Sequence, residues 1–160
     1  MPNDLNVFES TEWERDIGGA RGTRVGAAAG ARELGGTLYE LDPRGQAAPY
    51  HMHHGNEELL IVLDGALELR TPDGTHEITK GAVVAFPAGA GGAHRVRNAS
   101  DTPARYMIVS TMRFPDVAEQ LDTGTVLAIK GPADGWAFPS GSDGDYIALT
   151  IEALKADPGS

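Results

Sequence analysis

The stretch of sequence that decides the fold spans residues 45–65 and reads Gly45-QAAPY-His51-Met52-His53-HGNE-Glu58-LLIVLD-Gly65. Side chains alternate between the two faces of a β-strand, so His51 and His53 point to the same side and His54 points to the other. A turn after His54 lets the next strand return Glu58 to the side that carries the histidine pair. Imidazole and carboxylate groups that converge in this way are ligands for a divalent first-row metal. The stretch therefore predicts two short strands with a metal site beside them.

Glu57 and Glu58 compete for the role of the acidic ligand, and strand alternation favours Glu58. Glu58 then shares its face with Leu60 and Val62. Glu57 faces outward together with three apolar residues, which are Leu59, Ile61 and Leu63. Because both faces of this strand are apolar, the outer face needs cover from another sheet, from the N-terminal leader or from a second subunit. We expect a homodimer.

Residues 37–112 alternate short β-type runs with turn residues, a pattern that is typical of an all-β sandwich or barrel. Asp64-Gly65 and Asp73-Gly74 are the strongest hairpin turns. After residue 112, PDVAEQLDTG can carry a short helix, and TVLAI and DYIALTIEAL can add strands or a closing helix. The strand candidates before that point are TLYELDP, EELLIVLD, ALELRT, THEIT, AVVAFP, HRVRN and ARYMIVSTM.

The chain has 160 residues, which matches one ordinary domain, and 41% of them are hydrophobic, enough for a packed core. We divide the sequence into three parts of that single domain. Residues 1–33 form a leader that packs on the core, residues 34–115 form the barrel, and residues 116–160 form a C-terminal extension that completes it. The secondary structure of the leader is left open.

The charge balance excludes two classes of partner. Asp and Glu number 23 against 13 Lys and Arg, and the formal net charge of -10 disfavours binding to nucleic acid or to anionic membranes. The chain has no cysteine, so any metal must use nitrogen and oxygen donors. No apolar run approaches the ~18 residues of a membrane span, and the first residues lack an apolar signal segment. We expect a soluble, cytoplasmic protein.

A second motif follows the first and reads Gly81-AVVAF-Pro87-Ala88-Gly89-AGGA-His94-RVR-Asn98. Together the two motifs resemble those of the cupin superfamily. The first motif of that family is glycine, five residues, His-x-His, three or four residues, Glu, six residues and glycine, and this chain matches it completely. The second is glycine, five residues, Pro-x-Gly, two residues, His, three residues and Asn. Here four residues separate Gly89 from His94, and the point at which His94 enters the cavity is left open.

The resemblance implies a double-stranded β-helix, or jelly-roll barrel, with His51, His53, Glu58 and His94 around one divalent transition metal. Similar proteins hold iron, manganese, nickel, copper, cobalt or zinc, and they are often dimers. They include dioxygenases, decarboxylases and isomerases, and others only bind small molecules. We therefore expect a metal-dependent dioxygenase-type enzyme for a small organic substrate, with Glu58 also acting as a base. The alternatives are a Lewis-acid isomerase or decarboxylase and a non-catalytic, small-molecule-binding or sensory cupin.

The remaining histidines and arginines receive less specific interpretations. His54 is expected at the surface or an interface, and His76 at the surface. Apart from Arg95 and Arg97, neither motif contains a basic residue to clamp a phosphate, so a phosphosugar substrate is disfavoured. Several larger side chains could shape a pocket, although most are expected in the core: Tyr39, Tyr50, Phe86, Met107 and Trp136.

Overall fold

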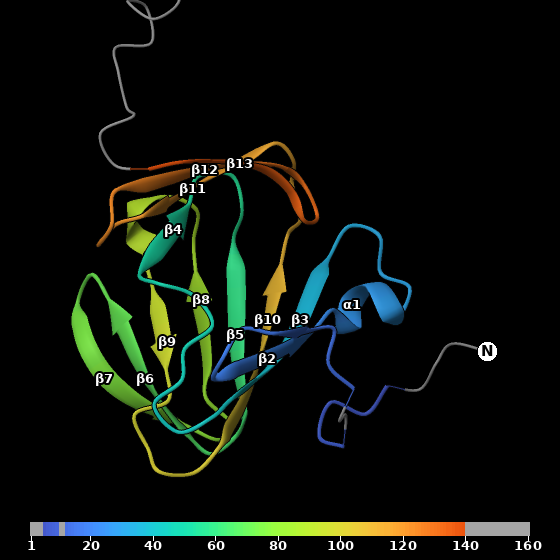
Figure 1. Ribbon diagram of the computed structural model, residues 1–160, viewed down its shortest axis with the longest axis vertical. Coiled ribbons are helices and arrows are strands. Elements are labelled where there is room, and N and C mark those ends of the chain that lie inside the picture. The colour runs from blue at the N-terminus through green and yellow to red at the C-terminus, as the bar shows by residue number, and fades with distance from the viewer. Residues whose placement is uncertain (1–4, 10–11, 140–160) are drawn as a thin grey trace, which may run out of the picture.

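The computed structural model describes residues 5–9 and 12–139, and nearly all of the regular structure in these ranges is β-strand (Figure 1). This confirms the predicted all-β fold. The segment DYIALTIEAL lies outside the described residues. Within the described ranges, no helix has the length and apolar character needed to cross a membrane. The helical elements are α1 (Val25–Ala28) and the 3-10 turn η1 (Ala90–Gly92).

The strands form three antiparallel sheets. The six-stranded sheet contains β1 (Arg15–Asp16), β2 (Ala20–Thr23), β3 (Gly35–Leu41), β10 (Ala104–Ser110), β5 (Glu58–Asp64) and β8 (Val83–Phe86) in that order. The three-stranded sheet contains β7 (Gly74–Thr79), β6 (Ala66–Thr71) and β9 (Arg95–Arg97). The four-stranded sheet contains β13 (Asp134–Phe138), β12 (Thr125–Gly131), β11 (Asp116–Gln120) and β4 (His51–His53), and in Figure 1 its β11, β12 and β13 lie across one end of the barrel.

The main core fills the barrel between the six-stranded and three-stranded sheets. Leu60 and Val62 of β5 are almost completely buried in it, as strand alternation predicted. Burial of each such side chain stabilises the fold by about 1.5–3 kcal/mol relative to exposure. Inward side chains of the neighbouring strands complete this core: Leu41, Leu67, Leu69, Phe86, Val96 and Tyr106.

The outer face of β5 is covered in part by the leader. Leu63 belongs to a second buried apolar cluster, against which Ile61 packs together with Val7 and Trp13 of the leader. The leader also adds β1 and β2 to the edge of the six-stranded sheet, beside β3. Leu59, on the same outer face, remains 36% exposed. Among the described residues, the leader therefore covers the apolar outer face at one end of β5 but leaves Leu59 at the other end partly exposed.

The segment after Met112 corrects one expectation. The helix expected in PDVAEQLDTG was wrong, because Asp116–Gln120 forms strand β11 between β4 and β12. Its side chains alternate, with Asp116 and Ala118 buried and Val117 exposed, which is the period of a strand. For TVLAI, where a strand or a closing helix was expected, the structure forms a strand, as part of β12. The pairing of β11 with β4 sets Ala118 opposite His53 and brings Asp116 to the candidate site.

Candidate metal centre

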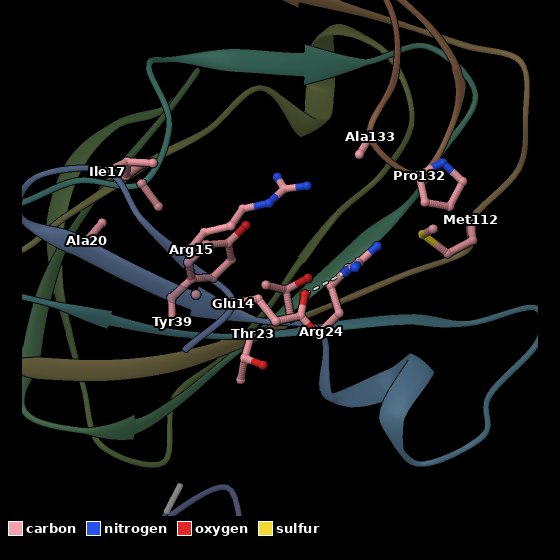
Figure 2. Close-up of a pocket in the computed structure, with 13 residues that line it drawn as sticks. Glu14, Arg15, Ile17, Ala20, Thr23, Arg24, Tyr39, Met112, Pro132 and Ala133 are labelled. Atoms are coloured by element: carbon pink, nitrogen blue, oxygen red, sulfur yellow. Dashed lines mark hydrogen bonds and ion pairs between the residues drawn. The ribbon is translucent and has the colours of Figure 1, made fainter. Parts of the chain in front are cut away.

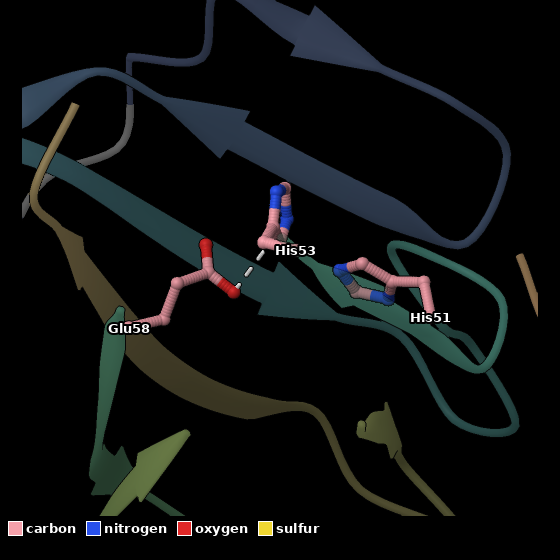
Figure 3. A group of neighbouring side chains, drawn as sticks. All are labelled: His51, His53 and Glu58. Carbon is pink, nitrogen blue, oxygen red and sulfur yellow. Dashed lines mark ion pairs between the residues drawn. The ribbon is translucent and has the colours of Figure 1, made fainter. Parts of the chain in front are cut away.

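Three of the predicted ligands converge at the end of the barrel that β4 borders (Figure 3). His51 and His53 extend from the same face of β4, and Glu58 begins β5. One ligand atom from each residue lies within 4.8 Å of the other two, and His53 Nε2 lies 3.9 Å from Glu58 Oε2. Ligand atoms about 2.0–2.2 Å from a shared ion stand roughly 3–3.5 Å apart, so a small inward movement of these side chains would accommodate one. The donor set therefore fits a first-row divalent metal.

His94 reaches the same place from a different element. Its Nε2 lies 3.4 Å from Glu58 Oε2, and its ring stacks on Phe86 with ring centroids 3.7 Å apart. Backbone hydrogen bonds in both directions tie residue 94 to His51. The two residues that lengthen the second motif are taken up by η1, so the longer loop still delivers His94 beside Glu58.

In two of the histidines, a backbone carbonyl oxygen determines which ring nitrogen carries the proton. His51 Nδ1 lies 2.8 Å from the Pro49 carbonyl oxygen, and His94 Nδ1 lies 2.9 Å from the Gly92 carbonyl oxygen. A carbonyl oxygen can only accept a hydrogen bond, so both Nδ1 atoms donate. Burial lowers the pKa of both imidazoles, to about 3 for His94. Both rings are therefore neutral at pH 7, and each presents an Nε2 lone pair toward the centre.

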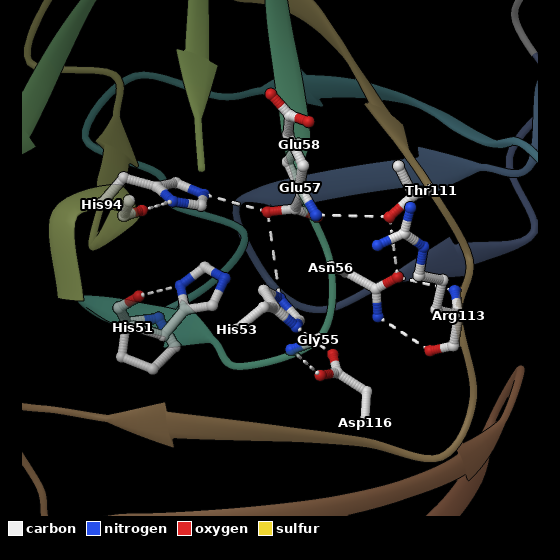
Figure 4. A network of polar contacts seen from close by, with 12 residues as sticks. His51, His53, Gly55, Asn56, Glu57, Glu58, His94, Thr111, Arg113 and Asp116 are labelled. Carbon is white, nitrogen blue, oxygen red and sulfur yellow. Dashed lines mark hydrogen bonds and ion pairs between the residues drawn. The ribbon is translucent and has the colours of Figure 1, made fainter. Parts of the chain in front are cut away.

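His53 is held by a residue that the sequence analysis missed. Its Nδ1 lies 2.7 Å from Oδ2 of Asp116, whose other oxygen accepts a hydrogen bond from the Gly55 N–H (Figure 4). Burial alone would raise the pKa of Asp116, but the Asn56 and His53 side chains outweigh it and lower this pKa. Asp116 is therefore ionised, and it orients the His53 ring by accepting a hydrogen bond from the Nδ1–H of His53. Interpreting this segment as a helix concealed the alternation that turns Asp116 inward.

The turn before β5 selects Glu58 over Glu57. The buried Asn56 accepts hydrogen bonds from Thr111 Oγ1 and the Arg113 N–H, and its amide donates to the Arg113 carbonyl oxygen (Figure 4). These bonds fix the turn, so that Glu57 is exposed and Glu58 faces the histidines. Strand alternation predicted this orientation correctly.

Glu58 shares its surroundings with two tyrosines. Burial raises the pKa of Glu58, an effect that the Asp116 charge adds to and His53 opposes. Tyr39 and Tyr106 stack with ring centroids 5.1 Å apart, and both line the cavity beside Glu58. Burial also raises the pKa of both phenols, so their hydroxyls are protonated at neutral pH and can donate hydrogen bonds to a ligand.

The cavity at the donors has a volume of about 70 Å³ and adjoins a larger pocket of about 240 Å³. Tyr39 and Ala47 line both. The larger pocket is lined on one side by the leader, including Arg15 and Arg24, and on another by Ala133 in the turn between β12 and β13 (Figure 2). Both arginines lie outside the two motifs, in the leader.

The remaining predicted positions lie apart from the donors. His54 is half-exposed and pairs with Glu119, with Nε2 2.6 Å from the carboxylate oxygen. His76 is exposed on β7. Both agree with a surface location. Trp136, considered as a core or pocket residue, is 58% exposed, whereas Phe86 is buried against His94.

The fold and the donors together define a jelly-roll barrel with a candidate metal site at one end. Residues 37–110 match the family model described as the cupin domain. These residues therefore form a cupin domain, as the two motifs predicted.

Solved structures extend the likeness beyond the motifs. A sugar phosphate isomerase of the cupin superfamily from Silicibacter pomeroyi is 29% identical, with a TM-score of 0.71, and the match covers 81% of this chain and 82% of that one. The polyketide cyclase RemF from Streptomyces resistomycificus is 23% identical, with a TM-score of 0.58, and the match covers 72% of this chain and 84% of that one. The second likeness shows the fold alone. No curated protein matched the chain.

Proposed function

We propose that the chain is a divalent-metal-dependent enzyme that isomerises a small hydroxy-carbonyl compound, with His51, His53, Glu58 and His94 as the metal ligands. The observation that carries this proposal is the convergence of the histidines on Glu58, with each Nδ1 already engaged by an oxygen acceptor. Support for isomerisation comes from the 29% identical sugar phosphate isomerase.

The bound ion, Glu58 and Tyr39 would have different roles in such a reaction. A bound divalent ion would polarise the substrate carbonyl and acidify the neighbouring C–H. Glu58 Oε2 is the oxygen close to His53 and His94, which leaves Oε1 to take the proton from the carbinol carbon and return it to the former carbonyl carbon. The hydroxyl proton of the substrate would pass to the former carbonyl oxygen. Tyr39 lines both cavities, and its hydroxyl is a donor that could hydrogen-bond a substrate oxygen there.

Hydrogen exchange tests this proposal even while the natural substrate is unidentified. The full-length protein, loaded in turn with Mn, Fe, Co, Ni, Cu or Zn, is incubated in D₂O with small aldoses and ketoses, and loss of the C–H signal beside the carbonyl is followed by ¹H NMR. We expect exchange with at least one ion, and its loss in Glu58→Gln but not in Glu57→Gln, whose side chain is exposed. Exchange that persists in Glu58→Gln would contradict the role of this carboxylate.

A dioxygenase is the second candidate, because nitrogen and carboxylate donors with coordination positions left open also suit Fe(II). It makes a different prediction in an oxygen electrode: the iron-loaded protein consumes oxygen with a catechol, diketone or flavonoid, and His53→Ala abolishes the consumption. Oxygen uptake without hydrogen exchange would favour this reaction. Ligand binding with neither activity would favour a sensory cupin.

A further inference from the structure

The larger pocket beside the donors has an unusual charge for this protein. The chain carries a formal net charge of -10, yet two arginines of the leader, Arg15 and Arg24, line this pocket of about 240 Å³. Figure 2 shows both side chains extending into it from the leader. Because the pocket shares Tyr39 and Ala47 with the donor cavity, a molecule that occupies both would place one end at the arginines and the other at the histidines.

The two arginines differ in how far their charge is already balanced. Arg24 Nε lies 2.7 Å from Oε2 of Glu14, which also lines the pocket. Among the described residues, the Arg15 side chain has no ion-pair or hydrogen-bond partner. The three exposed side chains at the pocket wall therefore sum to one net positive charge, because Glu14 balances only one of the two arginines.

We propose that Arg15 and Arg24 bind an oxyanion at the far end of the substrate, a phosphate ester or a carboxylate. A guanidinium group presents paired N–H donors that match two oxygens of either group, and its charge strengthens these hydrogen bonds. The substrate class is then a small hydroxy-carbonyl compound that carries a terminal phosphate or carboxylate. The oxyanion site stands on the arginines and the pocket, whereas the hydroxy-carbonyl end rests on the proposed function.

This assignment reverses the expectation from the two motifs that a phosphosugar is disfavoured. That expectation depended on the scarcity of basic residues within the motifs. Arg95 is instead paired with Glu68 on the three-stranded sheet, and neither Arg95 nor Arg97 lines the donor cavity or the larger pocket. The basic residues at the pocket come from the leader.

The test uses inorganic phosphate and acetate as probes of the full-length protein without added metal, so that binding to a bound ion does not contribute. Isothermal titration calorimetry is performed on the wild type, Arg15→Ala, Arg24→Ala and Arg32→Ala. Arg32→Ala is the control, because this substitution removes the same charge from an exposed position outside the pocket. We expect saturable binding that weakens at least about tenfold in Arg15→Ala and Arg24→Ala, since charge-assisted hydrogen bonds are lost, and that changes less than twofold in Arg32→Ala.

The order of the two probes identifies the anion. Tighter binding of phosphate supports a phosphate ester, and tighter binding of acetate supports a carboxylate. Absence of saturable binding of both probes, or an equal loss in all three variants, would overturn the proposal. Metal binding is measured separately on the same variants, and we expect it to be unchanged. A chain that binds phosphate through Arg15 but holds no metal would refute the proposed function and leave the oxyanion site standing.

Discussion

The three histidines differ in the group that accepts their Nδ1 proton. His51 and His94 donate to backbone carbonyl oxygens, which no substitution of a side chain removes directly. His53 donates to the carboxylate of Asp116. A carboxylate acceptor raises the basicity of the imidazole and fixes its orientation, and both effects strengthen binding through Nε2. A substitution of Asp116 therefore changes the hydrogen bond that orients His53 while leaving the His53 side chain in place.

The substitution Asp116→Asn tests this support. Asparagine keeps one acceptor oxygen but loses the charge and the second acceptor that the Gly55 N–H uses. We expect zinc affinity, measured by competition with a chelating dye, to fall about 10–100-fold. The matched control is Glu119→Gln, which alters the carboxylate that contacts the exposed His54 and should leave the affinity unchanged. Equal affinity in the two variants would show that Asp116 does not support the ligand.

At the scale of the elements, strand alternation predicted the metal ligands of β4 and β5 but did not predict strand β11 or the arginines of the leader. The faces of His51, His53 and Glu58 follow from strand alternation, which needs only neighbouring residues. Strand β11 was missed because its identity is decided by pairing with β12 and with β4, and β4 is distant in sequence. Arg15 and Arg24 were missed for the same reason, since only the folded leader brings them beside Tyr39.

The short turn η1 predicts a further effect on the site, because it carries the chain into His94. A Cβ at Gly92 would overlap the carbonyl oxygen of Pro87, whereas a Cβ at Gly91 would meet nothing within 4 Å. We expect Gly92→Ala to shift the turn, lowering the melting temperature and weakening zinc binding by about tenfold or more, the effect of disturbing one ligand. Gly91→Ala should match the wild type both in melting temperature and in zinc affinity, each measured by calorimetry. If Gly92→Ala also matches the wild type, η1 does not determine the position of His94.

At the scale of the whole molecule, the described residues leave part of the outer face of the six-stranded sheet exposed. Val83 of β8 is 60% exposed and pairs with Ile61 of β5, whose neighbour Leu59 lies beyond the cover of the leader. A contiguous apolar area of this kind is a typical site of association between subunits. The homodimer expected from the sequence stays a prediction, and we propose this face for its interface.

Analytical ultracentrifugation tests the interface. We expect the wild type to sediment as a dimer and Val83→Asp to sediment as a monomer, because a buried unpaired carboxylate strongly disfavours association. Val117→Asp is the control, since Val117 is also exposed but lies on β11 in another sheet. A dimer that survives Val83→Asp would place the interface elsewhere, and a monomeric wild type would refute the dimer.

Metal binding by the full-length chain is the most direct test of the central claim, that His51, His53, Glu58 and His94 form one metal site. Divalent ions are titrated into the chelator-treated protein by calorimetry, and the melting temperature is recorded with and without each ion. We predict a single ion per chain, a higher melting temperature in its presence, and loss of both effects in His51→Ala, His53→Ala and His94→Ala but not in His54→Ala or His76→Ala. A protein that binds none of these ions, or whose binding survives all three ligand substitutions, would contradict the account.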